Sequence, residues 1–169
     1  MLMIREMVEK DCAVIARSFA AQGWEKPEGQ FRRYWKEQLD HQRIVLVAIF
    51  DGAFAGYLTI VWMSDYPPFR EFNIPEIVDL NVLIKFCRMG IANRLMEEAE
   101  KRIVEKAPKA GLGVCLHSDY GPAQALYARR GYIPDGRGVY YRGHHLQYGE
   151  QVVLDDDLCL YLIKPLENC

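Results

Sequence analysis

The chain has 169 residues, of which 50% are hydrophobic and 26% are charged, and its 21 basic and 23 acidic residues give a formal net charge of -2. This size and composition predict a single globular domain over residues 1–169. The near-neutral charge excludes the basic stripe of a nucleic-acid-binding protein, and no apolar run approaches the ~20 residues of a membrane span. We therefore expect neither a nucleic-acid partner nor a membrane partner.

The cysteine pattern favours a reducing compartment. The five cysteines are odd in number and contain no Cys-x-x-Cys pair, which argues against a disulfide framework and a zinc knuckle. No histidine has an acidic or cysteine partner at metal-ligand spacing, so no metal is expected. Cys115 and Cys159 lie in apolar runs and are predicted to be core residues. The charged N-terminal sequence MLMIREMVEKD does not resemble a signal peptide, and we expect a cytoplasmic protein.

The first half of the chain predicts a strand, two helices and a hairpin. Residues 1–6 form a short strand, and Asp11 is the expected N-cap of a helix that carries Ile15 and Phe19 on one side. An amphipathic helix follows over residues 28–41. The runs 44–50 and 53–63 are rich in β-branched and aromatic residues, and the Asp51-Gly52 pair between them is typical of a tight hairpin turn.

The second half predicts four further strands and two further helices. Residues 64–75 contain three prolines and are expected to form a loop, and residues 76–83 to form a strand. From residue 90 to 107 the apolar residues recur every fourth position, as in an amphipathic helix. A strand over 112–117, a short helix that starts at Gly121-Pro122 and stops at Gly131, and strands over 139–141 and 158–164 complete a mixed α/β chain.

The passage from strand to helix at residues 82–92 is the strongest functional signal. A strand runs into a tight loop, and a long helix begins at Gly90. Such a helix start directs unpaired backbone N–H groups and the positive end of the helix dipole at one point, which suits a pyrophosphate. Neither a P-loop nor a dinucleotide-binding glycine motif is present. From the residues alone, an ordinary turn into a helix remains the alternative.

Two motifs give the chain a resemblance to the GNAT acetyltransferase superfamily. Leu80-Asn81-Val82 followed by residues 87–92 (CRMGIA) resembles the strand L-x-V and the loop Q/R-x-x-G-x-G/A of that family, with Cys87 in place of the usual first residue and Arg88 beside it. Residues 123–132 (AQALYARRGY) resemble the helix A-x-x-L-Y-x-x-x-G-[FY], and Tyr120 stands where that family often has Asn.

The resemblance implies a fold and a cosubstrate. The fold is an acyl-CoA N-acyltransferase fold, with a central, mostly antiparallel sheet of about seven strands, a splayed parallel pair and about four flanking helices. Acetyl-coenzyme A (acetyl-CoA) would lie along the strand that ends at Val82 and Leu83, with its pyrophosphate on the loop and helix start. The implied cofactor-binding residues are Val82, Leu83, Cys87, Arg88, Met89, Gly90, Ile91, Ala92 and Tyr120.

Two residues are candidates for acid–base catalysis. Acetyl transfer to an amine needs a neutral nitrogen, and a carboxylate can remove its proton. Glu76 and Asp79 are three apart on one predicted strand, so only one of them faces the cleft, and the resemblance to histone-type acetyltransferases favours Glu76. The resemblance also assigns Tyr127 as the general acid that protonates the leaving thiolate. Core packing of Tyr127 and solvation of Glu76 are the structural alternatives.

The acceptor is left open by the sequence. Trp24, Tyr34, Trp35 and residues 65–70 are candidates for its binding wall. A small-molecule amine and a peptide amine both fit, as do a monomer and a homodimer. A non-catalytic coenzyme A-binding domain, in which sensing or contact with a partner replaces turnover, is the second functional hypothesis.

Overall fold

The computed structural model describes residues 1–167, and these residues divide into two compact units. The first unit consists of Met1–Trp62 and Ile77–Arg102, and the second consists of Met63–Glu76 and the chain from Ile103 onward. The chain alternates helices and strands, so the predicted mixed α/β class is confirmed. No helix in the described residues is long and apolar enough to cross a membrane.

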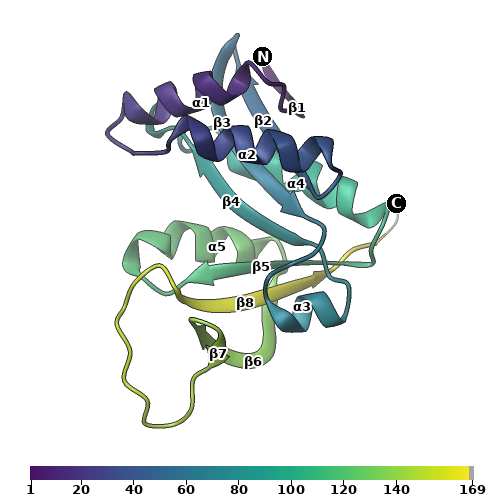
Figure 1. Cartoon of the computed structure of the whole chain (residues 1–169), viewed down its shortest axis with the longest axis vertical. Coiled ribbons are helices and arrows are strands. Elements are labelled where there is room, and N and C mark those ends of the chain that lie inside the picture. Colours follow the sequence, from purple (N-terminus) through teal and green to yellow (C-terminus); the bar gives the residue numbers. More distant parts are fainter. Residues whose placement is uncertain (168–169) are drawn as a thin grey trace. The chain divides into compact units, whose positions relative to one another are not determined.

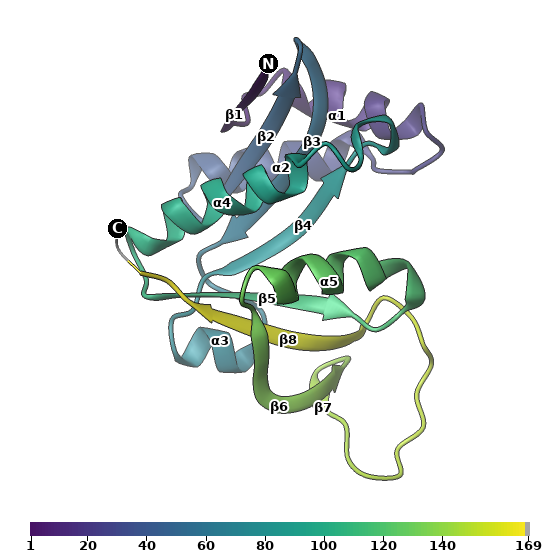
Figure 2. The same ribbon diagram turned by 180° about the vertical axis from the view of Figure 1, so that it is seen from behind.

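The first unit is a sheet with helices on both faces. Its hydrogen-bonded strand order is β1 (Leu2–Glu6), β2 (Arg43–Phe50), β3 (Ala53–Val61) and β4 (Glu76–Val82). Helices α1 (Asp11–Ala20) and α2 (Glu28–Leu39) lie on one face, and α4 (Ile91–Val104) lies on the other (Figures 1 and 2). Asp51 and Gly52 have φ of 46° and 81°, which confirms the predicted hairpin turn between β2 and β3.

Apolar residues from both helices and the sheet form the core of the first unit. Phe19 of α1, Phe31 of α2 and Tyr57 of β3 are fully buried, and their rings meet edge to face. Burial also explains the spacing that predicts a helix after Gly90. Every fourth residue of α4 is buried, starting with Ile91 and Leu95.

The second unit has a smaller sheet with one helix on each face. Its strand order is β5 (Lys109–Cys115), β8 (Leu158–Pro165), β6 (Ile133–Tyr141) and β7 (His144–His145), all antiparallel. Helices α3 (Pro67–Glu71) and α5 (Gly121–Arg129) lie on opposite faces of β5 and β8 (Figures 1 and 2). Gly131 has φ of 88° just after α5, as predicted for a helix stop.

Several predicted boundaries are wrong for local reasons. The predicted loop over 64–75 contains α3, because Pro67 and Pro68 occupy the first helical positions, where no N–H is needed, and Phe69 is buried. Asp11 does not cap α1: it is the first helical residue, and its carboxylate accepts hydrogen bonds from Arg5 and the Val8 amide. Strand β5 begins three residues earlier than predicted, and β6 six residues earlier.

The two central cysteines of the second unit are half-buried rather than core residues. Cys115 and Cys159 are register partners in β5 and β8, and their Sγ atoms are 3.5 Å apart. Cys169 lies outside the described residues. The cysteine prediction fails because both residues lie near the ends of their strands, Cys115 as the last residue of β5 and Cys159 as the second residue of β8, and their side chains there are only partly covered.

Candidate functional site

The loop between β4 and α4 has the geometry of an anion-binding turn. After a single 3-10 turn over Ile84–Phe86, Arg88 and Gly90 both adopt left-handed backbone conformations, with φ of 63° and 78°. The Gly90 carbonyl accepts from the Arg94 amide at 3.1 Å and thus begins α4. Within residues 1–167, no acceptor is present for the backbone N–H groups of residues 88–92. Left-handed residues beside a helix start gather such groups into a concave surface that suits an anion.

Space at Gly90 is also open. A β-carbon at this position would meet no atom within 4 Å, and Gly90 is exposed, as are Cys87, Arg88 and Met89. Gly90 is therefore required by its backbone conformation and not by a protein neighbour. The predicted cofactor-binding residues 82–92 form one continuous stretch of the first unit, whereas the predicted Tyr120 lies in the second unit.

The end of β4 presents its backbone to two sides. The Leu83 amide donates to the Ala55 carbonyl of β3 at 2.8 Å, and the Leu83 carbonyl accepts from Phe86. Neighbouring residues of a strand direct their N–H and C=O groups to opposite sides, so the polar groups of Val82 point away from β3. Of the two residues predicted to bind the pantetheine, Val82 is thus the one whose backbone suits pairing with an added strand.

A cavity of about 730 Å³ opens beside this strand end, between α1 and the loop. The basic side chains of Arg17 and Lys85 are in its lining, together with Leu83. Gln22 is also in the lining, and its side-chain oxygen accepts from the Ile84 amide at 3.0 Å. The Gln22 amide nitrogen is buried and has no partner in the described part of the chain. The cavity combines apolar walls, two cations and an unused donor, which suits a polar chain with acidic groups.

Asp79 is the centre of a hydrogen-bond network that the sequence did not reveal. Its carboxylate accepts from Tyr57 at 2.6 Å, from Asn81 at 2.7 Å and from Tyr34 and Gln30 at 3.2 Å. Burial, and then the charge of Asp79, raise the pKa of both tyrosines, so both phenols stay protonated donors.

The backbone of Asp79 is also unusual. Its φ of 60° interrupts the pleat of β4, as a bulge residue does. The prediction that Glu76 and Asp79 face opposite sides assumes a regular strand, and the left-handed φ of Asp79 departs from that regularity. The Asp79 side chain is directed toward α2 and the connection between α1 and α2.

Glu76 is the first residue of β4 and the one residue of that strand that belongs to the second unit. Its carboxylate accepts a hydrogen bond from the Ser64 hydroxyl, which in turn accepts from the Tyr66 amide at 2.9 Å. The negative charge of Glu76 contributes to the raised pKa of Tyr161, after the larger effect of burial. Glu76 is therefore positioned by a serine that is itself fixed by the backbone.

Tyr127 and Tyr120 belong to the same unit. Burial, and then the charge of Cys115, raise the pKa of Tyr127 to about 12, and its ring packs against Tyr132. In the described residues nothing shares a hydrogen bond with the Tyr127 hydroxyl, which leaves it for a ligand. The Tyr120 hydroxyl instead donates to Asp156 at 3.1 Å.

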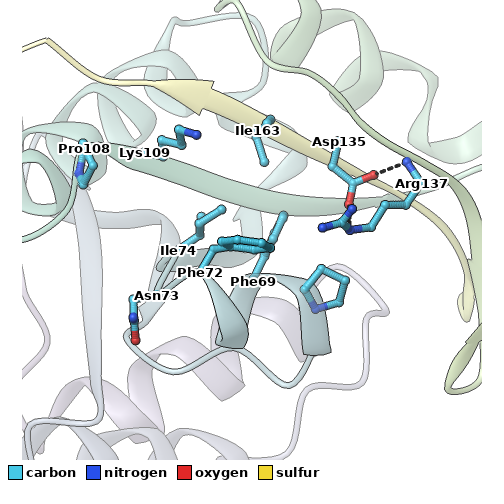
Figure 3. Close-up of a pocket in the computed structure, with 10 residues that line it drawn as sticks. Phe69, Phe72, Asn73, Ile74, Pro108, Lys109, Asp135, Arg137 and Ile163 are labelled. Atoms are coloured by element: carbon cyan, nitrogen blue, oxygen red, sulfur yellow. Dashed lines mark hydrogen bonds and ion pairs between the residues drawn. The ribbon is translucent and has the colours of Figure 1, made fainter.

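An aromatic cluster supports the other face of the second unit. Tyr66 stacks on Tyr161 at 3.6 Å between ring centres, and its hydroxyl bridges Asp135 at 2.7 Å and His145 at 2.8 Å. A cavity of about 330 Å³ nearby has apolar walls that include Phe69, and the Asp135–Arg137 ion pair lies at one end (Figure 3). Residues 65–70, expected to form part of an acceptor wall, include the start of α3, and Phe69 of this helix packs on Tyr161 of β8.

Comparison with known proteins identifies the fold. Residues 10–132 match the model of the acetyltransferase (GNAT) family. The ribosomal-protein-alanine N-acetyltransferase of Brucella melitensis has a TM-score of 0.71 and 18% identity, covering 97% of this chain and 99% of that one. The yncA protein of Salmonella typhimurium, solved with its cofactor acetyl-CoA, has a TM-score of 0.70 and 14% identity, covering 100% and 96%.

A third similar structure is the GNAT-family acetyltransferase of Streptococcus pneumoniae, with a TM-score of 0.69, 19% identity and coverage of 98% of this chain and 100% of that one. No curated protein sequence matches significantly. At these identities the solved structures establish the fold alone. Membership of the family rests on the match to the family model.

Proposed function

Because the chain belongs to the acetyltransferase (GNAT) family, we propose that it transfers an acetyl group from acetyl-CoA to a primary amine. The family match spans residues of both compact units, which supports treating residues 1–169 as one acetyltransferase domain. The observation that carries the proposal is the set of backbone amides at residues 88–92, which have no acceptor among residues 1–167 and lie around a glycine with open space beside it.

These residues fit the diphosphate of acetyl-CoA. The amides of the turn and of the start of α4 donate to the phosphate oxygens, and the helix dipole favours the negative charge. Arg88 adds a positive side chain, and the backbone of Val82 pairs with the pantetheine. Acetyl-CoA supplies an activated acyl group, and the chain supplies the orientation and the proton transfers.

Glu76 and Tyr127 are the proposed acid–base pair. Glu76, fixed by Ser64, removes the proton of the acceptor ammonium directly or through one water, which exposes the nitrogen lone pair. Tyr127 keeps its proton near neutral pH because its pKa is about 12, and it donates that proton to the departing thiolate. The products are an N-acetylated amine and coenzyme A with a free thiol.

A thiol-reactive dye tests the proposal by following coenzyme A release with a panel of primary amines. We expect amine-dependent release together with a rise in melting temperature when acetyl-CoA alone is added. A melting shift without release on any amine would support a coenzyme A-binding protein that does not catalyse transfer. If acetyl-CoA causes no melting shift and no amine causes coenzyme A release, both functions are excluded.

A further inference from the structure

The connection between α1 and α2 places a lysine in a cage of rings and a carboxylate. The Lys26 Nζ lies 3.2 Å from the Asp79 carboxylate and 5.6 Å from the ring centres of both Phe19 and Tyr57. The Lys26 side chain is only 19% exposed and that of Asp79 17%, although lysine is among the most exposed residues in proteins. Aromatic faces within about 6 Å and a partner carboxylate together bind an ammonium ion.

The cage is built without the help of Lys26. Four side chains besides Lys26 donate to Asp79, and they lie on α2, β3 and β4. Phe19 is fully buried on α1 and packs against Tyr57. The walls thus come from regular elements that are fixed by the core, and removing the lysine would leave a formed anionic site.

Lys26 itself is attached to the least regular part of this region. It lies in the connection between the end of α1 at Ala20 and the start of α2 at Glu28, three residues after Gly23 with φ of 79°. Connections of this kind rearrange at lower cost than helices and strands. The lysine is therefore the part of the cage that a competing ammonium group could displace.

The chemistry of the cage indicates which nitrogen it holds. A carboxylate and two aromatic faces stabilise the protonated amine, whereas the nitrogen that attacks the acetyl group must be neutral. We propose that the cage is a subsite for a second, non-reacting ammonium group, so that the acceptor is a diamine or another amine with two cationic groups. Lys26 fills this subsite until the acceptor displaces it. This inference rests on the proposed acetyl transfer to an amine.

A pair of amines that differ by one group tests the subsite. 1,5-Diaminopentane carries the second ammonium group and 1-aminopentane does not. Lys26→Met removes the chain's own ammonium group from the subsite. The ratio of kcat/KM for the diamine to that for the monoamine is therefore expected to rise about tenfold over the wild-type ratio. The double variant Lys26→Met/Asp79→Asn should not show this rise in the ratio. The exposed Lys36 of α2 gives a control, since Lys36→Met removes the same charge outside the cage.

Direct binding keeps this test separate from that of the acetyl transfer. Titration calorimetry without acetyl-CoA should show 1,5-diaminopentane binding to Lys26→Met about tenfold more tightly than to the wild type, and weak binding to the double variant. Absence of this difference, with circular dichroism showing folded variants, would overturn the subsite. An equal gain in kcat/KM for both amines would also overturn it. Lys26→Ala repeats the test if the methionine variant does not fold.

Discussion

The ring of Phe69 occupies the space that a side chain on Gly111 would need. A β-carbon at Gly111 would lie 2.2 Å from a ring carbon of Phe69. Phe69 is 1% exposed and packs its ring against Tyr161 as well, so a β-carbon at Gly111 would have to displace a packed ring. The contact fixes α3 on β5, and it explains why the first residues of β5 include a glycine.

Gly111→Ala is therefore expected to destabilise the protein by about 1–3 kcal/mol, as overpacking of a filled core does. Chemical denaturation with urea measures the change in the free energy of unfolding. Gly29→Ala is the matched control, because a β-carbon there meets nothing within 4 Å and the position is helical. The free energy of unfolding of that control should rise by up to about 1 kcal/mol. Equal behaviour of the two variants would contradict the packing argument.

Gly90 should matter for the cofactor and little for the fold. Gly90→Val forces a branched residue into a φ of 78° and fills the open space at the start of α4. We expect the melting shift caused by acetyl-CoA to disappear while the circular dichroism spectrum is retained. Gly149→Val is the control, since Gly149 has φ of 87° and equally open surroundings in the second unit. A normal acetyl-CoA shift in Gly90→Val would refute the loop assignment.

The sequence predicts the elements whose signal is local. The hairpin at Asp51-Gly52 and the helix after Gly90 depend on a turn pair and on a period, and both are where they were expected. The helix α3 was missed because prolines favour both loops and first helical turns, and only the burial of Phe69 decides between them.

The Asp79 network could not be predicted for a different reason. Its members Gln30, Tyr34 and Tyr57 are between 22 and 49 residues from Asp79 in the chain. No periodicity joins them, and the left-handed φ of Asp79 within a strand is rare for a residue other than glycine. Tertiary packing alone brings these groups together.

The Arg5–Asp11 pair predicts a loss of stability in acid. Burial raises the pKa of Asp11, but hydrogen bonds from Arg5 and the Val8 amide outweigh it and hold the pKa below 3.8. A lowered pKa stabilises the fold above pH 3.8, and this stabilisation disappears as the pH falls through the folded-state value. Asp11→Ala should lower the free energy of unfolding by about 2 kcal/mol at pH 7 and by progressively less below pH 4.

Denaturation with urea between pH 2.5 and 7 checks this expectation. The exposed pair of Arg70 and Asp65, 3.2 Å apart, supplies the control. Asp65→Ala should change the free energy of unfolding by less than about 1 kcal/mol at any pH in that range. If Asp11→Ala lowers the free energy of unfolding by the same amount at every pH, the ion pair is not the source of the loss.

Glu76→Gln should slow transfer mainly at low pH. There the acceptor is protonated and needs a base, whereas at high pH the amine is already neutral. We expect kcat/KM to fall by about 100-fold at pH 6.5 and by much less at pH 9.5, with the acetyl-CoA melting shift preserved. Glu105→Gln, which changes an exposed carboxylate, should leave the pH–rate profile unchanged. A Glu76→Gln profile parallel to that of the wild type would exclude Glu76 as the base.

Tyr127→Phe isolates the proposed general acid, because it removes one hydroxyl and keeps the ring that packs on Tyr132. Since the hydroxyl has no hydrogen-bond partner in residues 1–167, its loss should leave the melting temperature nearly unchanged. We expect kcat to fall about 100-fold, with little change in KM for acetyl-CoA. With a pKa of about 12, the wild-type tyrosine stays protonated up to pH 10, so no decline of the rate below that pH should come from its ionisation. If Tyr127→Phe lowers the melting temperature but not kcat, Tyr127 is a packing residue, and another group protonates the thiolate.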